Sequence, residues 1–238
     1  MSSSTTKAAF WQGLRDGAPF LLVVVPFSVL FGVLATEAGL NLVQAMAFSI
    51  VVFGGAAQFT ALQLMVDNVP TAIVVISSLA VNLRVAMYSA SLTPYIGGAP
   101  VWQRALAAYF IVDQTYASSI AKYEAEPEMP VPQRIAYFFG VVVPICPAWY
   151  VFTVVGAVVG GQISPEYALD FALPITFLAL IAPMLRTAAH VAAALVAIVA
   201  SLVCATIPYN LGLIIAGTAG MMVGAQVELW STKRTNGQ

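Results

Sequence analysis

Three polar side chains of complementary chemistry stand inside long apolar stretches of this chain. Asn82 and Arg84 lie late in one stretch, and Asp113 lies in the middle of another. A guanidinium group binds carboxylates through two parallel hydrogen bonds, and a carboxylate can hold an ammonium group or a proton. Each charge also has a structural interpretation, since Arg84 can extend to a membrane interface and Asp113 can pair with a helix dipole or with Arg84. The sequence leaves both interpretations open.

Small residues and prolines interrupt the apolar stretches. Gly54 and Gly55 precede Gln58, and small residues permit close helix approach, so Gln58 either lines a cavity or bonds a neighbouring helix. Prolines and glycines in such helices can simply produce kinks, or they can mark broken helices whose free backbone groups form a binding site. Pro26 and Pro174 each lie near the middle of a stretch. These two stretches would run in opposite directions, as an inverted repeat requires.

The composition decides the environment of the chain. Of the 238 residues, 61% are hydrophobic and 8% are charged, whereas soluble domains carry about 25% charged residues. The formal net charge of −1 provides no basic surface for nucleic acid. The chain has no Walker-type Gly-rich loop, no His-Glu-x-x-His and no Gly-x-Ser-x-Gly. The sequence therefore predicts a membrane protein that is not an enzyme and that uses no metal and no cofactor.

The elements that must position the polar residues are eight apolar runs. Runs of about 20 residues match the thickness of a bilayer, and continuously apolar runs favour helices over the alternating ten-residue strands of a barrel. We expect an all-α integral membrane protein of about eight transmembrane helices, some broken at Pro or Gly. The expected helices span Ala18–Thr36, Leu42–Val66, Pro70–Ser89, Trp102–Lys122, Arg134–Gly160, Ala168–Pro183, Thr187–Ile207 and Tyr209–Glu228.

Charge placement predicts the orientation of the chain. Lys7 and Arg15 precede the first run, and two more basic residues follow the last. Because Lys and Arg favour the cytoplasmic side, both termini are expected in the cytoplasm. We expect one polytopic transmembrane domain over residues 1–238, with an interfacial N-terminus at 1–17 and a cytoplasmic tail at 229–238. Whether the second and fourth runs cross the bilayer fully or re-enter it is left open.

Four motifs carry a resemblance to a known family. They are Phe31-Gly-Val-Leu-Ala-Thr-Glu-Ala-Gly39, Phe53-Gly-Gly-Ala-Ala-Gln-Phe59, Asn82-Leu-Arg-Val-Ala-Met-Tyr88 and Asp113-Gln-Thr-Tyr116. In order and spacing they resemble the AzlC/YgaZ family, whose members are large subunits of branched-chain amino acid exporters. The third motif is similar to the family's Asp-x-Arg-x-x-x-Tyr run, and the fourth to its Thr-Asp-Glu-x-Phe run.

Two positions depart from the family pattern. Asn82 replaces an acidic residue of the family, and Gln114 replaces its Glu after the aspartate. A proton-coupling role of those two carboxylates is therefore in doubt for this chain, and its substrate preference can differ.

The resemblance implies a function, a partner and a location. It implies export of valine, leucine or isoleucine across the bacterial inner membrane together with a small hydrophobic AzlD/YgaH-like subunit. That subunit would pack on Gly- and Ala-rich faces such as Ala188–Ala200 and Gly217–Gly224. A channel or a non-transporting scaffold is the alternative function. The expected substrate-binding residues are Arg84, Asp113, Gln58, Gly54, Gly55, Asn82, Tyr88 and Pro26.

Overall fold

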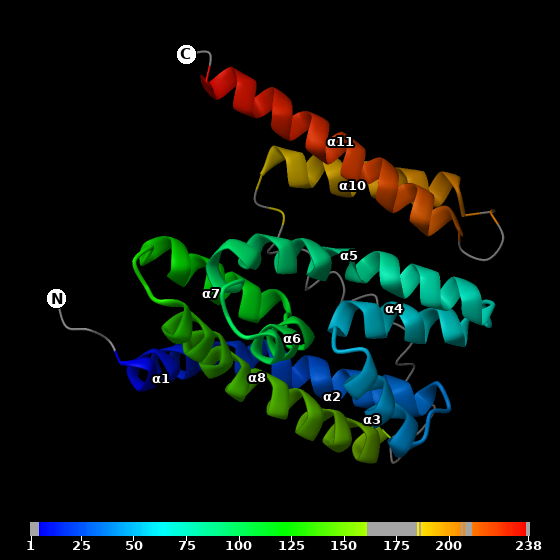
Figure 1. The fold of residues 1–238 in the computed structure, drawn as a ribbon. Coiled ribbons are helices and arrows are strands. Elements are labelled where there is room, and N and C mark those ends of the chain that lie inside the picture. Colours follow the sequence, from blue (N-terminus) through cyan, green and yellow to red (C-terminus); the bar gives the residue numbers. More distant parts are fainter. Residues whose placement is uncertain (1–4, 161–184, 186, 206, 208–210, 237–238) are drawn as a thin grey trace. The chain divides into compact units, whose positions relative to one another are not determined.

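The computed structural model describes residues 5–160, 185, 187–205, 207 and 211–236, and every regular element among them is a helix (Figure 1). The all-helical prediction is therefore confirmed. In chain order the helices are α1 Thr6–Gly17, the 3-10 helix η1 Ala18–Phe20, α2 Leu21–Glu37, α3 Leu42–Val51, α4 Gly55–Val66, α5 Thr71–Ile96, α6 Val101–Tyr109, α7 Asp113–Ala125, α8 Val131–Gly160, α10 Ala188–Val203 and α11 Leu211–Asn236.

The chain divides into two compact units. One comprises Met1–Val66 and Val74–Tyr167, and the other comprises Asp67–Ile73 and Ala168–Gln238. The first unit contains the helices from α1 to α8, apart from the first turn of α5. The described part of the second unit consists mainly of α10 and α11.

Long helices with glycine contacts form the core of the first unit. In Figure 1 α1 and α2 run along α8. A Cβ atom on Gly13 of α1 would lie 2.2 Å from the Tyr137 carbonyl oxygen of α8, and one on Gly156 of α8 would lie 2.0 Å from the Val29 carbonyl oxygen of α2. The backbones therefore touch where only glycine fits. Close approach of this kind is a common way for helices to associate in a bilayer.

Among the described residues, three helical stretches are long and apolar enough to cross a membrane. They are Thr6–Glu37, Thr71–Ile96 and Val131–Gly160, with lengths of 32, 26 and 30 residues. The first stretch begins inside the segment 1–17, which the sequence placed at an interface. Its α1 portion packs against α8, where the Tyr137 hydroxyl donates to an Asp16 carboxylate oxygen over 2.8 Å.

Two of the predicted runs prove to be pairs of short helices. The second run is α3 followed by α4, and the fourth is α6 followed by α7. By contrast, the fifth run forms one continuous helix, α8, although it contains Pro144 and Pro147. The predicted run Ala168–Pro183 lies outside the described residues, and so does Pro174. The inverted repeat therefore stays a prediction.

In the second unit α10 and α11 pack on each other through small residues. A Cβ atom on Gly220 would lie 2.8 Å from the Ala193 carbonyl oxygen, and one on Gly224 would lie 3.0 Å from the Ala193 Cβ atom. Parts of the two faces that we expected to bind a partner subunit thus bind each other. Small residues permit this close approach of two helices.

Candidate functional site

The first structural feature of the site is a break between α3 and α4. Helix α3 ends at Val51 and α4 begins at Gly55. In a continuous helix the Gly54 N–H would bond the carbonyl four residues earlier, that of Ile50. It bonds the Val52 carbonyl oxygen instead, at 2.9 Å. The Ile50 carbonyl is thereby freed from the helix and must find another donor.

A second break separates α6 from α7 at residues 110–112. This break contains neither glycine nor proline. The fully buried Thr115 holds it open, because its hydroxyl accepts the Val112 N–H at 2.9 Å. The same hydroxyl lies 3.0 Å from the carbonyl oxygens of Phe110 and Val112, and it donates to one of them. A threonine that bonds the backbone locally competes with the helical pattern.

The two breaks lie against each other. The Phe53 ring of the first break stacks on the Tyr109 ring with centroids 5.8 Å apart, and it meets the Phe110 ring edge-on at 5.9 Å. The Tyr109 hydroxyl donates to the freed Ile50 carbonyl oxygen at 2.6 Å. It also lies 3.1 Å from the Tyr150 hydroxyl of α8. The end of α6 thus supplies the donor that the first break lacks.

An ion pair joins the second break to α5. A terminal guanidinium nitrogen of Arg84 lies 3.0 Å from Asp113 Oδ2, with the two side chains 26% and 38% exposed. The Tyr88 hydroxyl donates to Asp113 Oδ1 over 2.9 Å. Asp113 is the first residue of α7, where the helix dipole favours a negative charge. The structure therefore brings Arg84, Tyr88 and Asp113 together.

Two tyrosines extend this network along the same helix faces. The rings of Tyr88 and Tyr116 are stacked with centroids 4.2 Å apart and an interplanar angle of 9°. The Tyr116 hydroxyl lies 3.1 Å from the Ser91 hydroxyl. Tyr116 is one turn beyond Asp113, and Ser91 is one turn beyond Tyr88. The sequence did not lead us to expect Tyr116, Ser91 or Thr115 in the site, although a spacing of three or four residues from the expected ones points to a shared face.

The uncharged candidates surround the first break. A Cβ atom on Gly54 would lie 2.9 Å from Asn82 Oδ1, and one on Gly55 would lie 3.1 Å from the Trp149 ring. Gln58 is fully buried and donates through Nε2 to the Ser49 hydroxyl of α3 at 3.1 Å. The glycines therefore serve close packing, and of the two interpretations of Gln58 the structure shows the bond to a neighbouring helix.

Several buried polar atoms near the breaks remain without a protein partner. Among the described residues, Gln58 Oε1, Asn82 Oδ1 and Arg84 Nε are buried and accept or donate no hydrogen bond. Such groups are rare in folded proteins, and a functional role is one explanation for them. Pro26 contrasts with them, since it is exposed and lies inside the uninterrupted helix α2. Within the described ranges, no three His, Cys, Asp or Glu side chains gather as a metal site would require.

A comparison with known protein families matches the part of the chain that holds the two helix breaks and the ion pair. Residues 19–163 match the sequence profile described as AzlC protein. This chain belongs to the AzlC family. The matched residues include both helix breaks and the Arg84–Asp113 ion pair. The resemblance seen in the sequence motifs is thereby confirmed.

Two relatives of this AzlC-family chain are membrane proteins. One is "Inner membrane protein YgaZ" of Escherichia coli (strain K12), 27% identical over 231 residues that cover 94% of this chain and 91% of the relative. The other is an "Uncharacterized membrane protein" of Archaeoglobus fulgidus, 28% identical over 198 residues that cover 82% of this chain and 84% of the relative. No solved structure matches the chain.

Proposed function

We propose that this protein is a secondary transporter that exports valine, leucine and isoleucine across the inner membrane, driven by an ion gradient. The observation that carries the proposal is the ion pair between Arg84 and Asp113, placed at a helix break in a membrane protein. Ionisable residues at membrane depth are costly, and those that occur usually serve transport or recognition. Membership of the AzlC family supports a membrane function of this kind.

The ion pair is suited to a zwitterion. An amino acid that enters a low-dielectric site must have both charges met, or it stays in water. Arg84 offers a guanidinium group for the carboxylate, and Asp113 offers a carboxylate for the ammonium group. Without substrate the two side chains neutralise each other at 3.0 Å. A zwitterion can insert between them and exchange one neutral set of contacts for another, so the site carries no unpaired charge in either state.

The apolar part of the substrate needs less specific contacts. Aromatic rings of the two breaks, among them Phe53 and Phe110, pack against each other and offer apolar surface for it. One methylene group in an apolar pocket changes binding by about 1–3 kcal/mol. The protein should therefore distinguish branched-chain amino acids from polar ones strongly and from one another weakly.

The partner and the orientation belong to the same proposal. We propose that the protein works with a small hydrophobic AzlD/YgaH-like subunit and that both of its termini face the cytoplasm. Co-purification from native membranes tests the subunit, and full activity of this chain alone would refute it. Reporter fusions at the two ends of the chain test the orientation, and a periplasmic signal from either end would refute it.

A transport measurement in reconstituted vesicles tests the function. The protein, with its small subunit, is placed in vesicles carrying an imposed ion gradient, and uptake of labelled leucine is followed over time. A secondary transporter accumulates leucine above its outside concentration, and the accumulation collapses with the gradient. A channel would only equilibrate leucine, and a scaffold would behave like empty vesicles. Either of those two results would contradict the proposal.

A further inference from the structure

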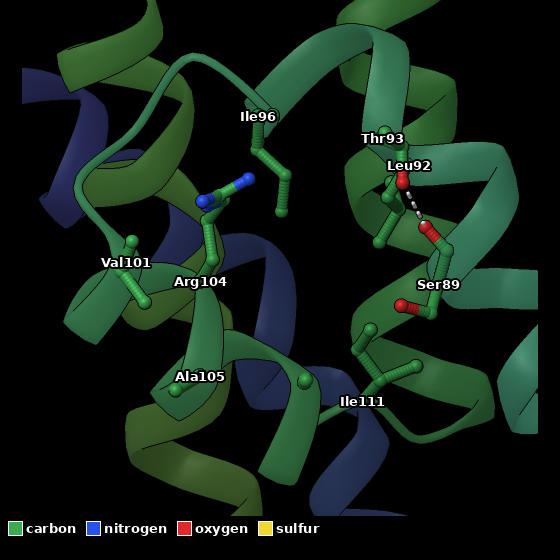
Figure 2. A pocket seen from close by; sticks show the side chains of 10 residues that line it. Ser89, Leu92, Thr93, Ile96, Val101, Arg104, Ala105 and Ile111 are labelled. Atoms are coloured by element: carbon green, nitrogen blue, oxygen red, sulfur yellow. Dashed lines mark hydrogen bonds between the residues drawn. The ribbon is translucent and has the colours of Figure 1, made fainter.

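A second group of polar and apolar side chains lies between the last turns of α5 and helix α6. There the structure contains a cavity of about 360 Å³, shown in Figure 2. Sites for small ligands enclose roughly 300–1,000 Å³, so this cavity is of a size for an amino acid. Its lining includes Ser89, Leu92, Thr93, Ile96, Arg104 and Ile111.

Part of the cavity wall is aliphatic and buried. Leu92, Ile96 and Ile111 line it and are exposed by only 0%, 6% and 2%, respectively. Buried side chains of this kind are closely packed by their neighbours. The cavity thus offers a preformed apolar surface to a branched aliphatic group.

Arg104 is the charged group of the cavity. Its side chain rises from α6 toward the end of α5 that carries Ile96 (Figure 2). Arg84 pairs with Asp113, and Arg134 donates to backbone carbonyls of Tyr95 and Pro127. Within the described part of the chain, the Arg104 side chain has neither an ion pair nor a hydrogen bond. Its guanidinium group is therefore available to a carboxylate, which it can bind bidentately.

The hydroxyl groups of the cavity differ in availability. The Thr93 hydroxyl donates to the Ser89 carbonyl oxygen at 2.8 Å, so its proton is already used. The Ser89 hydroxyl makes no hydrogen bond with any described residue. Ser89 can therefore contribute one polar contact in addition to that of Arg104.

Two lining residues of the cavity are close in sequence to the ion-pair network. Ile111 lies in the break between α6 and α7, two residues before Asp113, and Ser89 follows Tyr88 directly on α5. We infer that this cavity is a second subsite for the branched-chain amino acid, in which Arg104 binds the carboxylate on the way to or from the Arg84–Asp113 pair. This inference rests on the proposed transport function and names the group that recognises the substrate outside the ion pair.

Variants of Arg104 test the subsite. Arg104→Gln removes the charge, Arg104→Lys keeps it without the planar fork, and Arg15→Gln removes an exposed arginine of α1 as a matched control. Loss of one charge-assisted contact should raise the KM of leucine transport about tenfold with little change in kcat. The KM of Arg104→Lys should lie between those of the wild type and Arg104→Gln. The KM of Arg15→Gln should equal that of the wild type. Ala108 of α6 also lines the cavity. Ala108→Phe, which adds volume there and changes no charge, should raise the KM of leucine transport as well.

Binding of leucine analogues shows which group Arg104 recognises. Binding is measured by calorimetry on the purified complex. Arg104→Gln should weaken the binding of 4-methylpentanoate, which keeps the carboxylate, as strongly as it weakens the binding of leucine. The same substitution should leave the affinity for isopentylamine, which lacks the carboxylate, unchanged. Equal thermal unfolding of wild type and variant shows that the fold is intact.

The outcomes separate the subsite from the function. Transport by Arg104→Gln and Ala108→Phe with the wild-type KM overturns the subsite and leaves the proposed function standing. A phospholipid that co-purifies with the wild type and is lost from Arg104→Gln, with the leucine KM unchanged, also overturns it. A wild-type complex that neither binds nor transports leucine overturns both proposals.

Discussion

The break between α3 and α4 and the break between α6 and α7 reach the same interruption of a helix by different physical means. The first depends on missing side chains, since Gly54 and Gly55 leave room for Asn82 and Trp149. The second depends on hydrogen bonds, since the Thr115 hydroxyl takes the place of helical partners for the backbone.

The difference extends to charge. The polar groups next to the first break, Gln58 and Asn82, are neutral, and each has a buried oxygen with no donor among the described residues. The second break carries Asp113, which is partly exposed and paired with Arg84. A tight neutral break suits packing, whereas an accessible charged break suits the exchange of one ionic partner for another. We therefore propose the second break as the place for substrate chemistry and the first as its support.

The largest expected effect comes from the charged break. Asp113→Asn keeps the shape of the side chain and removes its charge, which leaves Arg84 unpaired. Losing one partner of a desolvated charge pair costs roughly 2–5 kcal/mol. The side chains here are 26% and 38% exposed, so solvent reduces this cost. We expect leucine export to fall at least about tenfold, which corresponds to about 1.4 kcal/mol. Arg84→Gln should behave alike.

The matched control is a second ion pair on the same helix. Lys122 and Glu126 lie 2.6 Å apart, with Glu126 about half exposed. The Lys122 side chain is only 11% exposed, but solvent at the half-exposed Glu126 position screens part of the loss. The pair also lies at the opposite end of α7 from Asp113, so Glu126→Gln should export normally. Export is measured in cells loaded with leucine-containing dipeptides, with membrane insertion checked in parallel. Wild-type rates for both Asp113→Asn and Arg84→Gln would show that the pair is structural.

The neutral break should respond to added volume. A Cβ atom on Gly54 would lie 2.9 Å from Asn82 Oδ1, and overpacking of this kind costs about 1–3 kcal/mol. Gly54→Ala should therefore lower the midpoint of thermal unfolding. The double variant Gly54→Ala with Asn82→Ala should recover part of the loss, because contacting residues are energetically coupled.

A helical glycine in open space provides the control for this volume effect. Apart from its chain neighbours and its own helix backbone, no atom of the described residues lies within 4 Å of a Cβ atom placed on Gly217. Gly217→Ala should therefore be neutral or stabilising by up to about 1 kcal/mol. If Gly54→Ala unfolds at the same temperature as Gly217→Ala, the first break does not depend on close packing.

The smallest expected effect comes from the hydrogen bonds of the second break. Thr115→Val keeps the volume and removes the hydroxyl, leaving the Val112 N–H without its buried acceptor. Loss of a helix cap costs about 0.5–2 kcal/mol, measured by thermal or denaturant unfolding. Thr115→Ser should retain most of the stability. Equal stability of Thr115→Val and wild type would mean that the loop conformation, and not Thr115, holds the break open.

The two breaks also differ in how far the sequence predicted them. Gly54 and Gly55 indicate a helix interruption by their residue type alone, because glycines inside an apolar run are costly unless they serve a contact or a break. The second break has no such signal, since residues 107–112 read Ala-Ala-Tyr-Phe-Ile-Val. The sequence left open whether these two runs cross the bilayer. It could not show that each consists of two helices.

The sequence by itself determined the environment and the class of the fold. So many apolar residues and so few charges require lipid, and in lipid the backbone must satisfy its hydrogen bonds within each segment, which favours helices. The sequence also identified Arg84 and Asp113, because charged residues are conspicuous in apolar runs. Only the tertiary structure decided that the two charges neutralise each other and that Tyr109 completes the first break. The reason is that these contacts join residues on separate helices, whose relative positions depend on side-chain packing and not on any local pattern.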